Sequence, residues 1–244
     1  MFEYSYEKIQ WNGFDGITFD FSDRKATVIF PKNPCENQKW ILKTEYSDAF
    51  PNFEIELLNQ GYGRVFITNR SRWCVAGDLE AKAALCEFLH TELGWNKKCF
   101  LVGMSCGGLV GIYFAATYPQ YVAGMYLDAP VTNLLSCPCN VGLAQGKIYD
   151  EFCKVTGMTV VDLINYRNHP IDRVDDLLIG NIPILLICGD CDIEVPYEEN
   201  GKVFAEKYQI KGGTIKSILV PGRGHHPHGL EDMTPMLEFV KLYY

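Results

Sequence analysis

Ser105 lies in a local pattern that is typical of a catalytic nucleophile. The stretch "FLVGMSCGGLVG" runs from Phe100 to Gly111 and places Ser105 between Gly103 and Gly107. A serine on a sharp turn between a strand and a helix needs a strained backbone. The residues two positions to either side must then be small, so that the two elements can approach each other. An apolar run precedes Ser105 and a helical pattern follows it, which indicates a nucleophile elbow.

Partners for this serine follow it along the chain. A serine hydroxyl is a poor nucleophile at neutral pH, so it needs a histidine to accept its proton and a carboxylate to fix the histidine tautomer. Two later apolar runs end in such residues, "ILLICGDCDIEVP" in two aspartates and "ILVPGRGHHPHGL" in three histidines: Asp190, Asp192, His225, His226 and His228. The order serine, aspartate, histidine predicts a catalytic triad.

Elements that position these residues can be read from the hydrophobic pattern. Short apolar runs rich in β-branched and aromatic residues predict strands at Gly16–Phe21, Ala26–Phe30, Arg64–Thr68, Cys99–Gly103, Val122–Leu127, Ile182–Cys188 and Ile215–Val220. Periodic patterns with capping residues predict helices at Pro51–Asn59, Asp78–Leu93, Cys106–Thr117, Glu198–Tyr208 and Thr234–Leu242.

The order of these elements predicts an α/β fold. From Arg64 onward strands and helices alternate, which requires a mostly parallel central sheet with helices on both faces. Short turns at Asn12–Gly13 and Ser22–Asp23 indicate an antiparallel edge. The alternation is interrupted at Val131–Asn181, which we expect to form a small cap insertion at one end of the sheet. Residues 1–244 are predicted to form a single domain.

At this level of detail the chain resembles the α/β-hydrolase superfamily, from about Gly16 to its end. The motifs "GMSCGG", "GDCDIEVP" and "GRGHHPHG" carry the resemblance, and "PGRGHHPH" with "FPKNP" is similar to small bacterial esterase-like serine hydrolases. The resemblance implies that Asp192 and His225 stand at the positions of the superfamily's acid and base. The resemblance implies hydrolysis of carboxylic esters, although the scaffold also serves thioesterases and peptidases.

The oxyanion hole is less well defined by the sequence. The backbone N–H of Cys106, directly after the nucleophile, is one expected donor. The loop "FPKNPCENQKW" stands where the superfamily often has a His-Gly pair, and its prolines cannot donate. Lys32 or Asn33 is therefore the expected second donor.

Several residues have an alternative interpretation. Asp128 in "YLDAP" is a third candidate acid, with a cap at a strand end as the preferred interpretation. Trp40, Tyr46 and Trp73 are expected near the active-site end, where Trp40 and Trp73 are candidate substrate-binding residues. The side chains of His226 and His228 are expected to bond loop carbonyls, and that of Cys106 to turn away from the serine. The sets "GHHPH" and "CPC" could bind a metal ion, but neither has the spacing of a recognised motif, so no metal site and no cofactor are expected.

Composition excludes other classes of function. A formal charge of −8 without a basic cluster argues against nucleic acid as a partner. The start "MFEYSYEKIQW" lacks the pattern of a signal peptide, and no apolar run approaches the ~20 residues of a membrane span. The ten cysteines are scattered through a long chain, which favours reduced thiols and a cytoplasmic location.

The expected function is therefore that of a serine hydrolase acting on a small-molecule ester. Because Val131–Asn181 has few long apolar stretches, we expect short acyl esters of polar or carbohydrate-like alcohols. The alternatives are a thioesterase or peptidase on the same fold, or a ligand-binding protein that retains the triad. The sequence predicts no oligomeric state.

Overall fold

A nine-stranded sheet forms the centre of the computed structural model, which describes residues 5–244. The strand order is β1-β2-β3-β5-β4-β6-β7-β8-β9. The first residues of the N-terminal segment considered above, 1–4, lie outside the described residues. The strands are β1 Tyr6–Trp11, β2 Phe14–Phe21, β3 Arg24–Ile29, β4 Trp40–Lys43, β5 Gly63–Ile67, β6 Cys99–Met104, β7 Val122–Asp128, β8 Ile184–Gly189 and β9 Ile215–Val220.

Strands β5, β4, β6, β7, β8 and β9 are parallel, and β1, β2 and β3 continue the sheet as an antiparallel edge. This confirms the predicted fold class. Two strands, β1 and β4, were absent from the predicted set. The strand β4 has only four residues and ends in a lysine, so its apolar run is too short to stand out.

Helices cover both faces of the sheet. The helices are α1 Asn52–Asn59, α2 Asp78–Leu93, α3 Cys106–Thr117, α4 Tyr149–Thr156, α5 Val160–Ile164, α6 Val174–Ile179, α7 Gly201–Ile210 and α8 Thr234–Tyr243. Buried residues of α2, α3, α6 and α7 form one core with one face of the sheet. Buried residues of α1 and α8 form a second core on the other face.

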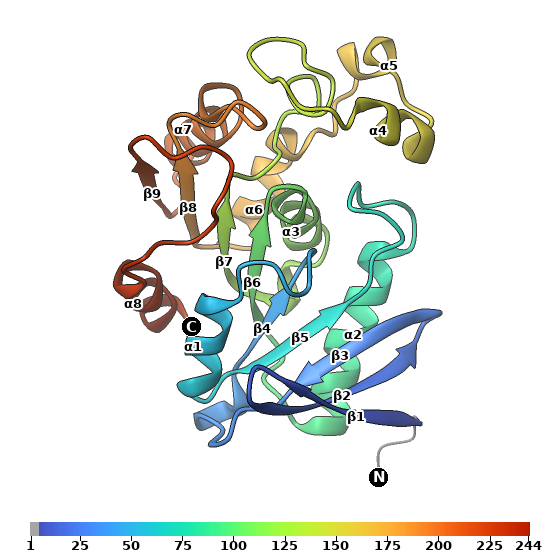
Figure 1. Cartoon of the computed structure of the whole chain (residues 1–244), viewed down its shortest axis with the longest axis vertical. Coiled ribbons are helices and arrows are strands. Elements are labelled where there is room, and N and C mark those ends of the chain that lie inside the picture. The colour runs from blue at the N-terminus through green and yellow to red at the C-terminus, as the bar shows by residue number, and fades with distance from the viewer. Residues whose placement is uncertain (1–4) are drawn as a thin grey trace.

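Residues 131–173, which we call the cap segment or the cap, lie at the end of the sheet to which the parallel strands point. Figure 1 shows α4 and α5 beyond the arrowheads of β6, β7 and β8. Val174 and Leu177 of α6 are fully buried in the core beneath the sheet. The interrupted region predicted at Val131–Asn181 therefore ends in a helix, α6, that belongs to the core and lies outside the segment of residues 131–173.

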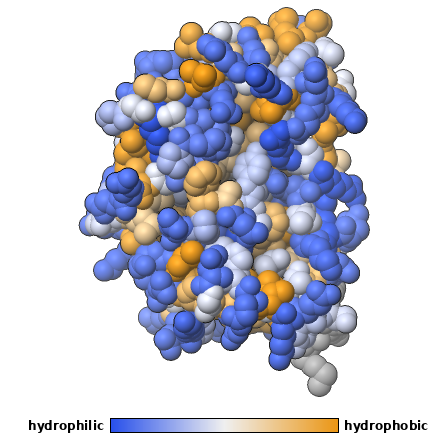
Figure 2. Space-filling view, in the orientation of Figure 1, coloured by the Kyte–Doolittle hydropathy of each residue, from blue (hydrophilic) through white to orange (hydrophobic). Residues whose placement is uncertain are grey.

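Hydrophilic residues cover most of the face seen in Figure 2, with hydrophobic residues in small groups between them. Such scattered apolar residues are normal for a protein surface in water. Within residues 5–244, no helix has the length and apolar character needed to cross a bilayer.

Candidate active site

Ser105 occupies the sharp turn between β6 and α3. Its backbone has φ 53° and ψ −122°, a conformation that a residue with a side chain rarely adopts. A Cβ atom on Gly103 would lie 2.6 Å from the carbonyl oxygen of Gly107, so strand and helix approach this closely only because position 103 is a glycine. The N–H of Ser105 donates to the Asp128 carbonyl at 2.9 Å, which fixes the turn against β7.

Three side chains meet at this turn in a chain of hydrogen bonds. The Oγ of Ser105 lies 3.0 Å from Nε2 of His225. The Nδ1 of His225 lies 2.7 Å from Oδ2 of Asp192. Because an ionised carboxylate only accepts, Nδ1–H donates to Asp192, and Nε2 is left to accept the serine proton. The structure thus brings Ser105, His225 and Asp192 together at 3.0 and 2.7 Å.

Asp192 is itself held by its own loop. Its second oxygen, Oδ1, accepts the backbone N–H groups of Glu194 and Val195, each at 2.9 Å. The side chain is almost fully buried. Asp190 instead accepts the N–H of Gly222 at 2.6 Å and stands away from His225, as expected for a residue at the turn.

Asp128 also serves a different purpose from a triad acid. Its carboxylate is fully buried and accepts Nη2 of Arg223 and Nδ1–H of His228, each at 2.9 Å. It also accepts the hydroxyl of Tyr126 at 2.6 Å and the N–H of Gly229 at 2.9 Å. Asp128 therefore anchors the His loop, residues 221–229, rather than capping its own strand.

The two neighbouring histidines, His226 and His228, make different contacts. His228 does not bond a loop carbonyl through Nδ1, because that atom donates to the Asp128 carboxylate. His226 is exposed, and its ring stacks at 14° on the ring of Phe50. The rings of His225, His226 and His228 lie 4.8 to 5.1 Å apart between centroids.

Cys106 begins α3, so its backbone N–H has no acceptor within the helix and faces the turn. Its thiol is buried, and burial raises the pKa of Cys106 to about 11, against which contacts with the Tyr46 and Ser105 hydroxyls act. The thiol therefore does not turn away from the serine as expected. At neutral pH it is protonated and a weak nucleophile.

The expected second oxyanion donor, Lys32 or Asn33, lies at the wrong end of the sheet. Strand β3 runs antiparallel to β5, so the loop after β3 lies at the amino ends of the parallel strands. The Lys32 ammonium is accordingly found 5.4 Å from the centre of the Phe14 ring. The missed strand β4 is the reason for this error, because it is the strand whose following loop reaches Ser105.

That loop, Thr44–Tyr46, packs directly against the start of α3. The Thr44 hydroxyl donates to the Gly107 carbonyl at 2.6 Å. The Thr44 N–H donates to the Val102 carbonyl at 3.1 Å, whereas the N–H groups of Glu45 and Tyr46 make no main-chain hydrogen bond within residues 5–244. Burial raises the pKa of the Tyr46 phenol well above its usual value, with a further contribution from Cys106. The loop thus offers backbone donors that the sequence analysis did not identify.

Trp40 and Trp73 have different positions. Trp40 begins β4 and is fully buried at the amino end of the sheet, where Nε1 donates to the Asn96 carbonyl at 2.7 Å, so it cannot line a pocket beside Ser105. Trp73 lies on the cap side, where Nε1 donates to Glu151 at 3.1 Å. Arg72 forms a two-bond pair with the same Glu151 carboxylate, and this pair joins the body to α4.

Two cavities are lined by residues that neighbour the site, and none of the three triad side chains lines either of them. One of about 390 Å³ lies between the cap and the body and is lined by aromatic and aliphatic residues that include Trp73, Leu109 and Phe152. The other, of about 610 Å³, lies beneath the His loop. It is lined by Met104 of β6, Tyr126 of β7 and residues of α1, the His loop and α8.

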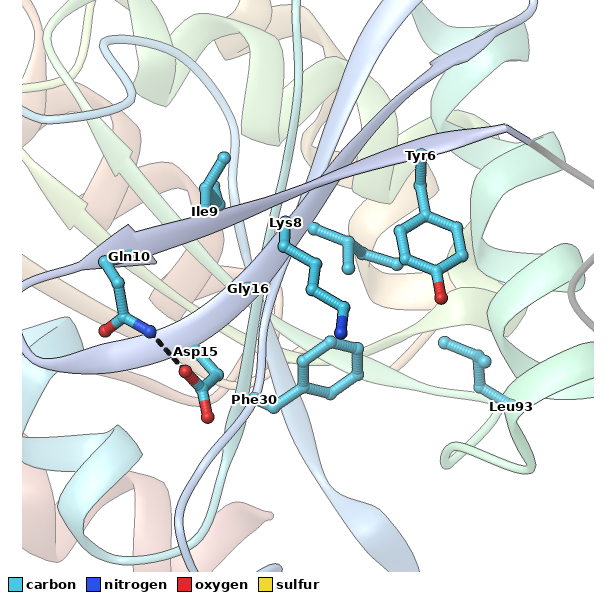
Figure 3. A pocket seen from close by; sticks show the side chains of 9 residues that line it. Tyr6, Lys8, Ile9, Gln10, Asp15, Gly16, Phe30 and Leu93 are labelled. Carbon is cyan, nitrogen blue, oxygen red and sulfur yellow. Dashed lines mark hydrogen bonds between the residues drawn. The ribbon is translucent and has the colours of Figure 1, made fainter.

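A third cavity, of about 530 Å³, lies at the antiparallel edge of the sheet. Figure 3 shows Lys8 and Phe30 beside it, and Gln10 bonded to Asp15 across β1 and β2. Three strands, β3, β5 and β4, separate β2 from β6 in the sheet, so this cavity is remote from Ser105.

All ten cysteines are free thiols. Cys137 is buried and Cys139 is half-buried, and burial raises the pKa of both thiols. Neither belongs to a group of metal-ligating side chains within residues 5–244. Cys137 packs in a buried hydrophobic cluster with Trp73 and Phe152, and Cys139 packs against that cluster.

The fold and the elbow define a serine hydrolase with the α/β-hydrolase fold. The chain belongs to the prolyl oligopeptidase family, whose sequence model matches residues 60–243. No individual curated protein matches the sequence.

Solved structures share this fold at low sequence identity. The acylaminoacyl peptidase of Pyrococcus horikoshii matches with a TM-score of 0.69 and 16% identity, over 92% of this chain and 38% of the peptidase. A puromycin-hydrolyzing peptidase of Mycobacterium tuberculosis matches at 0.69 and 15%, over 91% and 36%. Est1E from Butyrivibrio proteoclasticus matches at 0.65 and 20%, over 97% and 99%. The chain thus spans well under half of the two peptidases and nearly all of Est1E.

Proposed function

We propose that the chain hydrolyses carboxylic esters by two-step acyl transfer, with Ser105 as nucleophile, His225 as general base and Asp192 as the acid of the triad. The observation that carries this proposal is the hydrogen-bond chain of 3.0 and 2.7 Å through these side chains. His225 takes the hydroxyl proton as the serine attacks the carbonyl carbon. Asp192 stabilises the imidazolium that forms, and water then cleaves the acyl-enzyme.

The tetrahedral oxyanion needs two donors. The first is the N–H of Cys106, which its place at the start of α3 leaves free. The second is a backbone N–H of Glu45 or Tyr46, because the loop that carries them packs on Gly107 through Thr44. Both donors lie on backbone that is fixed before the reaction, which is the arrangement that lowers an acyl-transfer barrier most.

The substrate we propose is a short acyl ester of a polar or carbohydrate-like alcohol. The cavity between cap and body, at about 390 Å³, suits a small organic group rather than a lipid. Trp73 and Leu109 line it and pack in one hydrophobic cluster with Cys106, the residue after Ser105, so we assign this apolar surface to the acyl side of the substrate. No cofactor takes part in this mechanism.

A peptidase is the second candidate. The prolyl oligopeptidase family model and the fold shared with the two peptidases favour it. The same triad also serves thioesterases, and a ligand-binding protein would retain the triad without turnover.

Turnover of a matched set of substrates distinguishes these functions. The purified chain would be assayed on p-nitrophenyl acetate, butyrate and decanoate, acetylated sugars, an acyl thioester, and aminoacyl p-nitroanilides, with Ser105→Ala as the blank. We expect the highest kcat/KM on acetyl or butyryl esters. A preference for the p-nitroanilides would establish the peptidase instead, and preference for decanoate would reject the small acyl site. Release of a single product equivalent per chain would identify a binding protein.

A further inference from the structure

Three imidazole rings in the His loop converge on one point. One ring nitrogen from each of His225, His226 and His228 lies within 4.8 Å of the others. The ring planes are steeply inclined to one another, at 65°, 82° and 83°. Rings stacked face to face could not direct their nitrogens to a common centre, whereas inclined rings at similar spacing can.

Two of the rings are already oriented as metal ligands usually are. The Nδ1–H of His225 donates to the Asp192 carboxylate at 2.7 Å, and that of His228 donates to the Asp128 carboxylate at 2.9 Å. A carboxylate on one ring nitrogen fixes the tautomer, so that the other nitrogen carries the lone pair that a metal ion requires. On both rings the nitrogen left to a metal is Nε2.

The third ring can adjust. His226 is exposed and is backed by the Phe50 ring, which stacks on it at 5.6 Å. A zinc ion holds imidazole nitrogens at about 2.0–2.1 Å, which places them roughly 3.4 Å from one another. The atoms now within 4.8 Å must therefore draw closer, and rotation of the exposed His226 side chain provides most of that movement.

Charge around the three rings favours a cation. The Asp192 carboxylate is buried beside them, and within residues 5–244 its ion-pair partner is His225 alone. Arg223 offsets the charge of Asp128, because its Nη2 lies 2.9 Å from Oδ1 of that carboxylate. The site therefore holds one buried carboxylate, that of Asp192, which is not paired with an arginine or lysine within residues 5–244. Glu194 adds a second negative charge close to His226.

We propose that His225, His226 and His228 form a binding site for a divalent transition-metal ion of the zinc type, and that binding inhibits the enzyme reversibly. Three imidazole ligands with water as the fourth are a known tetrahedral arrangement for zinc. The metal takes the Nε2 lone pair of His225, which is the pair that accepts the Ser105 proton in the proposed mechanism. The inhibition therefore rests on the proposed function, whereas the site itself does not.

The spacing of the three histidines does not fit a helical metal motif, and His225 already has a proposed role, so the sequence alone predicts no metal site here. The structure answers both points. The histidines converge from a loop rather than from one helix face, and the catalytic role of His225 is what makes the metal an inhibitor rather than a cofactor.

Direct binding tests the site without any assay of activity. Zinc chloride would be titrated calorimetrically into chelator-treated, tag-free Ser105→Ala, a variant in which Nε2 of His225 is released from the serine. We expect one ion per chain. His226→Ala and His228→Ala should each weaken binding at least tenfold, since loss of even an outer partner typically costs about 10–100-fold. His90→Ala, a histidine on the exposed side of α2, should leave the affinity unchanged.

An exposed thiol is the competing ligand that this experiment must separate. Cys191 lies in the neighbouring loop and is exposed. Unchanged zinc affinity in both His226→Ala and His228→Ala, or loss of binding in Cys191→Ser, would overturn the proposed site.

Inhibition is measured separately on the wild-type chain, as the ratio of rates with zinc and with excess chelator. We expect full recovery of the rate with chelator, and a matching loss of zinc sensitivity in His226→Ala relative to its own metal-free rate. If zinc binds the three histidines and the chain hydrolyses nothing, the proposed function fails and the site stands. If hydrolysis depends on Ser105 but zinc does not bind, only the metal site fails.

Discussion

The carboxylate of Asp128 accepts the Nδ1–H of His228 at 2.9 Å, and so joins the end of β7 to the loop that carries His225. Arg223 and the Gly229 N–H bond the same carboxylate, so both ends of the His loop are tied to one buried acid. His225, the proposed general base, therefore owes its position to two aspartates, one bonded to its own ring and one to its loop.

Asp128→Asn should consequently destabilise the protein and lower turnover indirectly. The substitution leaves the buried Arg223 guanidinium without a charged partner, which costs about 3–5 kcal/mol in the free energy of unfolding. A displaced His225 should lower kcat by about tenfold to a hundredfold. This expectation replaces the small effect that a simple strand-end cap would have. Chemical unfolding and kcat on one aryl ester are the measurements.

Asp190→Asn is the matched control, because Asp190 lies at an exposed turn, where it accepts the N–H of Gly222 and contacts the exposed Cys191 thiol. It should shift the melting temperature slightly and leave kcat near the wild-type value. Equal behaviour of Asp128→Asn and Asp190→Asn would contradict the anchoring role.

Asp192→Asn should lower kcat by about 10³–10⁴ while the fold is retained. An asparagine amide donates to Nδ1 of His225 and so favours the tautomer whose Nε2–H cannot accept the serine proton. The two N–H groups of Glu194 and Val195 still bond the remaining oxygen, so the loop stays in place. If Asp128→Asn loses catalysis and Asp192→Asn does not, the acid lies on β7.

The three members of the proposed triad could be selected from the sequence because each of them lies in a local pattern. Ser105 is identified by the glycines around it, and Asp192 and His225 by apolar strands that end just before them. The loop of residues 44–46, which carries the proposed second oxyanion donor, could not be found in this way. The strand β4 has only three apolar residues, Trp40–Leu42, before the fully buried Lys43.

In a sequence, a lysine indicates a surface position, and its burial can be recognised only when its charged partner is known. The ammonium of Lys43 lies 2.6 Å from Oε1 of Glu54, and Nε of Arg64 lies 2.5 Å from Oε2 of the same carboxylate. These three residues are on β4, α1 and β5, so only the folded chain reveals that both cations pair with the one Glu54 carboxylate. Because β4 was not predicted, Lys32 and Trp40 were expected at the active-site end of the sheet. In the structure they lie at the opposite end.

Glu54→Gln should lower the free energy of unfolding by about 3–5 kcal/mol, because it leaves two buried cations without their counter-ion. Lys43 also donates to the Ala49 carbonyl at 3.0 Å, so the same change loosens the loop after β4. Urea unfolding of the variant would be compared with that of Glu56→Gln, a residue of the same helix whose carboxylate accepts an exposed hydrogen bond from the Gln60 amide at 3.0 Å. A Glu54→Gln protein as stable as Glu56→Gln would refute the triad of charges.

Lys82 gives the stability a defined dependence on pH. Burial lowers the pKa of Lys82 to about 8 in the folded chain, against an ordinary value of about 10.4 in the unfolded chain. Between these values the unfolded chain binds one more proton, so the free energy of unfolding rises with pH through this group. Lys82→Met lacks that contribution, and its stability relative to wild type should fall by about 2 kcal/mol from pH 8 to pH 10.

Urea unfolding at several pH values measures this difference directly. Lys25→Met removes a charge from an exposed side chain and should show a constant offset over the same range. A Lys82→Met offset that is equally constant would mean that Lys82 titrates normally in the folded protein.

Covalent labelling of the nucleophile tests the central claim most directly. The wild-type chain and Ser105→Ala would be treated with a fluorophosphonate, the labelled residue identified by peptide mass spectrometry, and steady-state hydrolysis of p-nitrophenyl acetate followed in parallel. We predict one label per chain on Ser105, and loss of both labelling and turnover in Ser105→Ala with an unchanged melting temperature. A label on another serine, together with a Ser105→Ala variant that still hydrolyses the ester, would contradict the account.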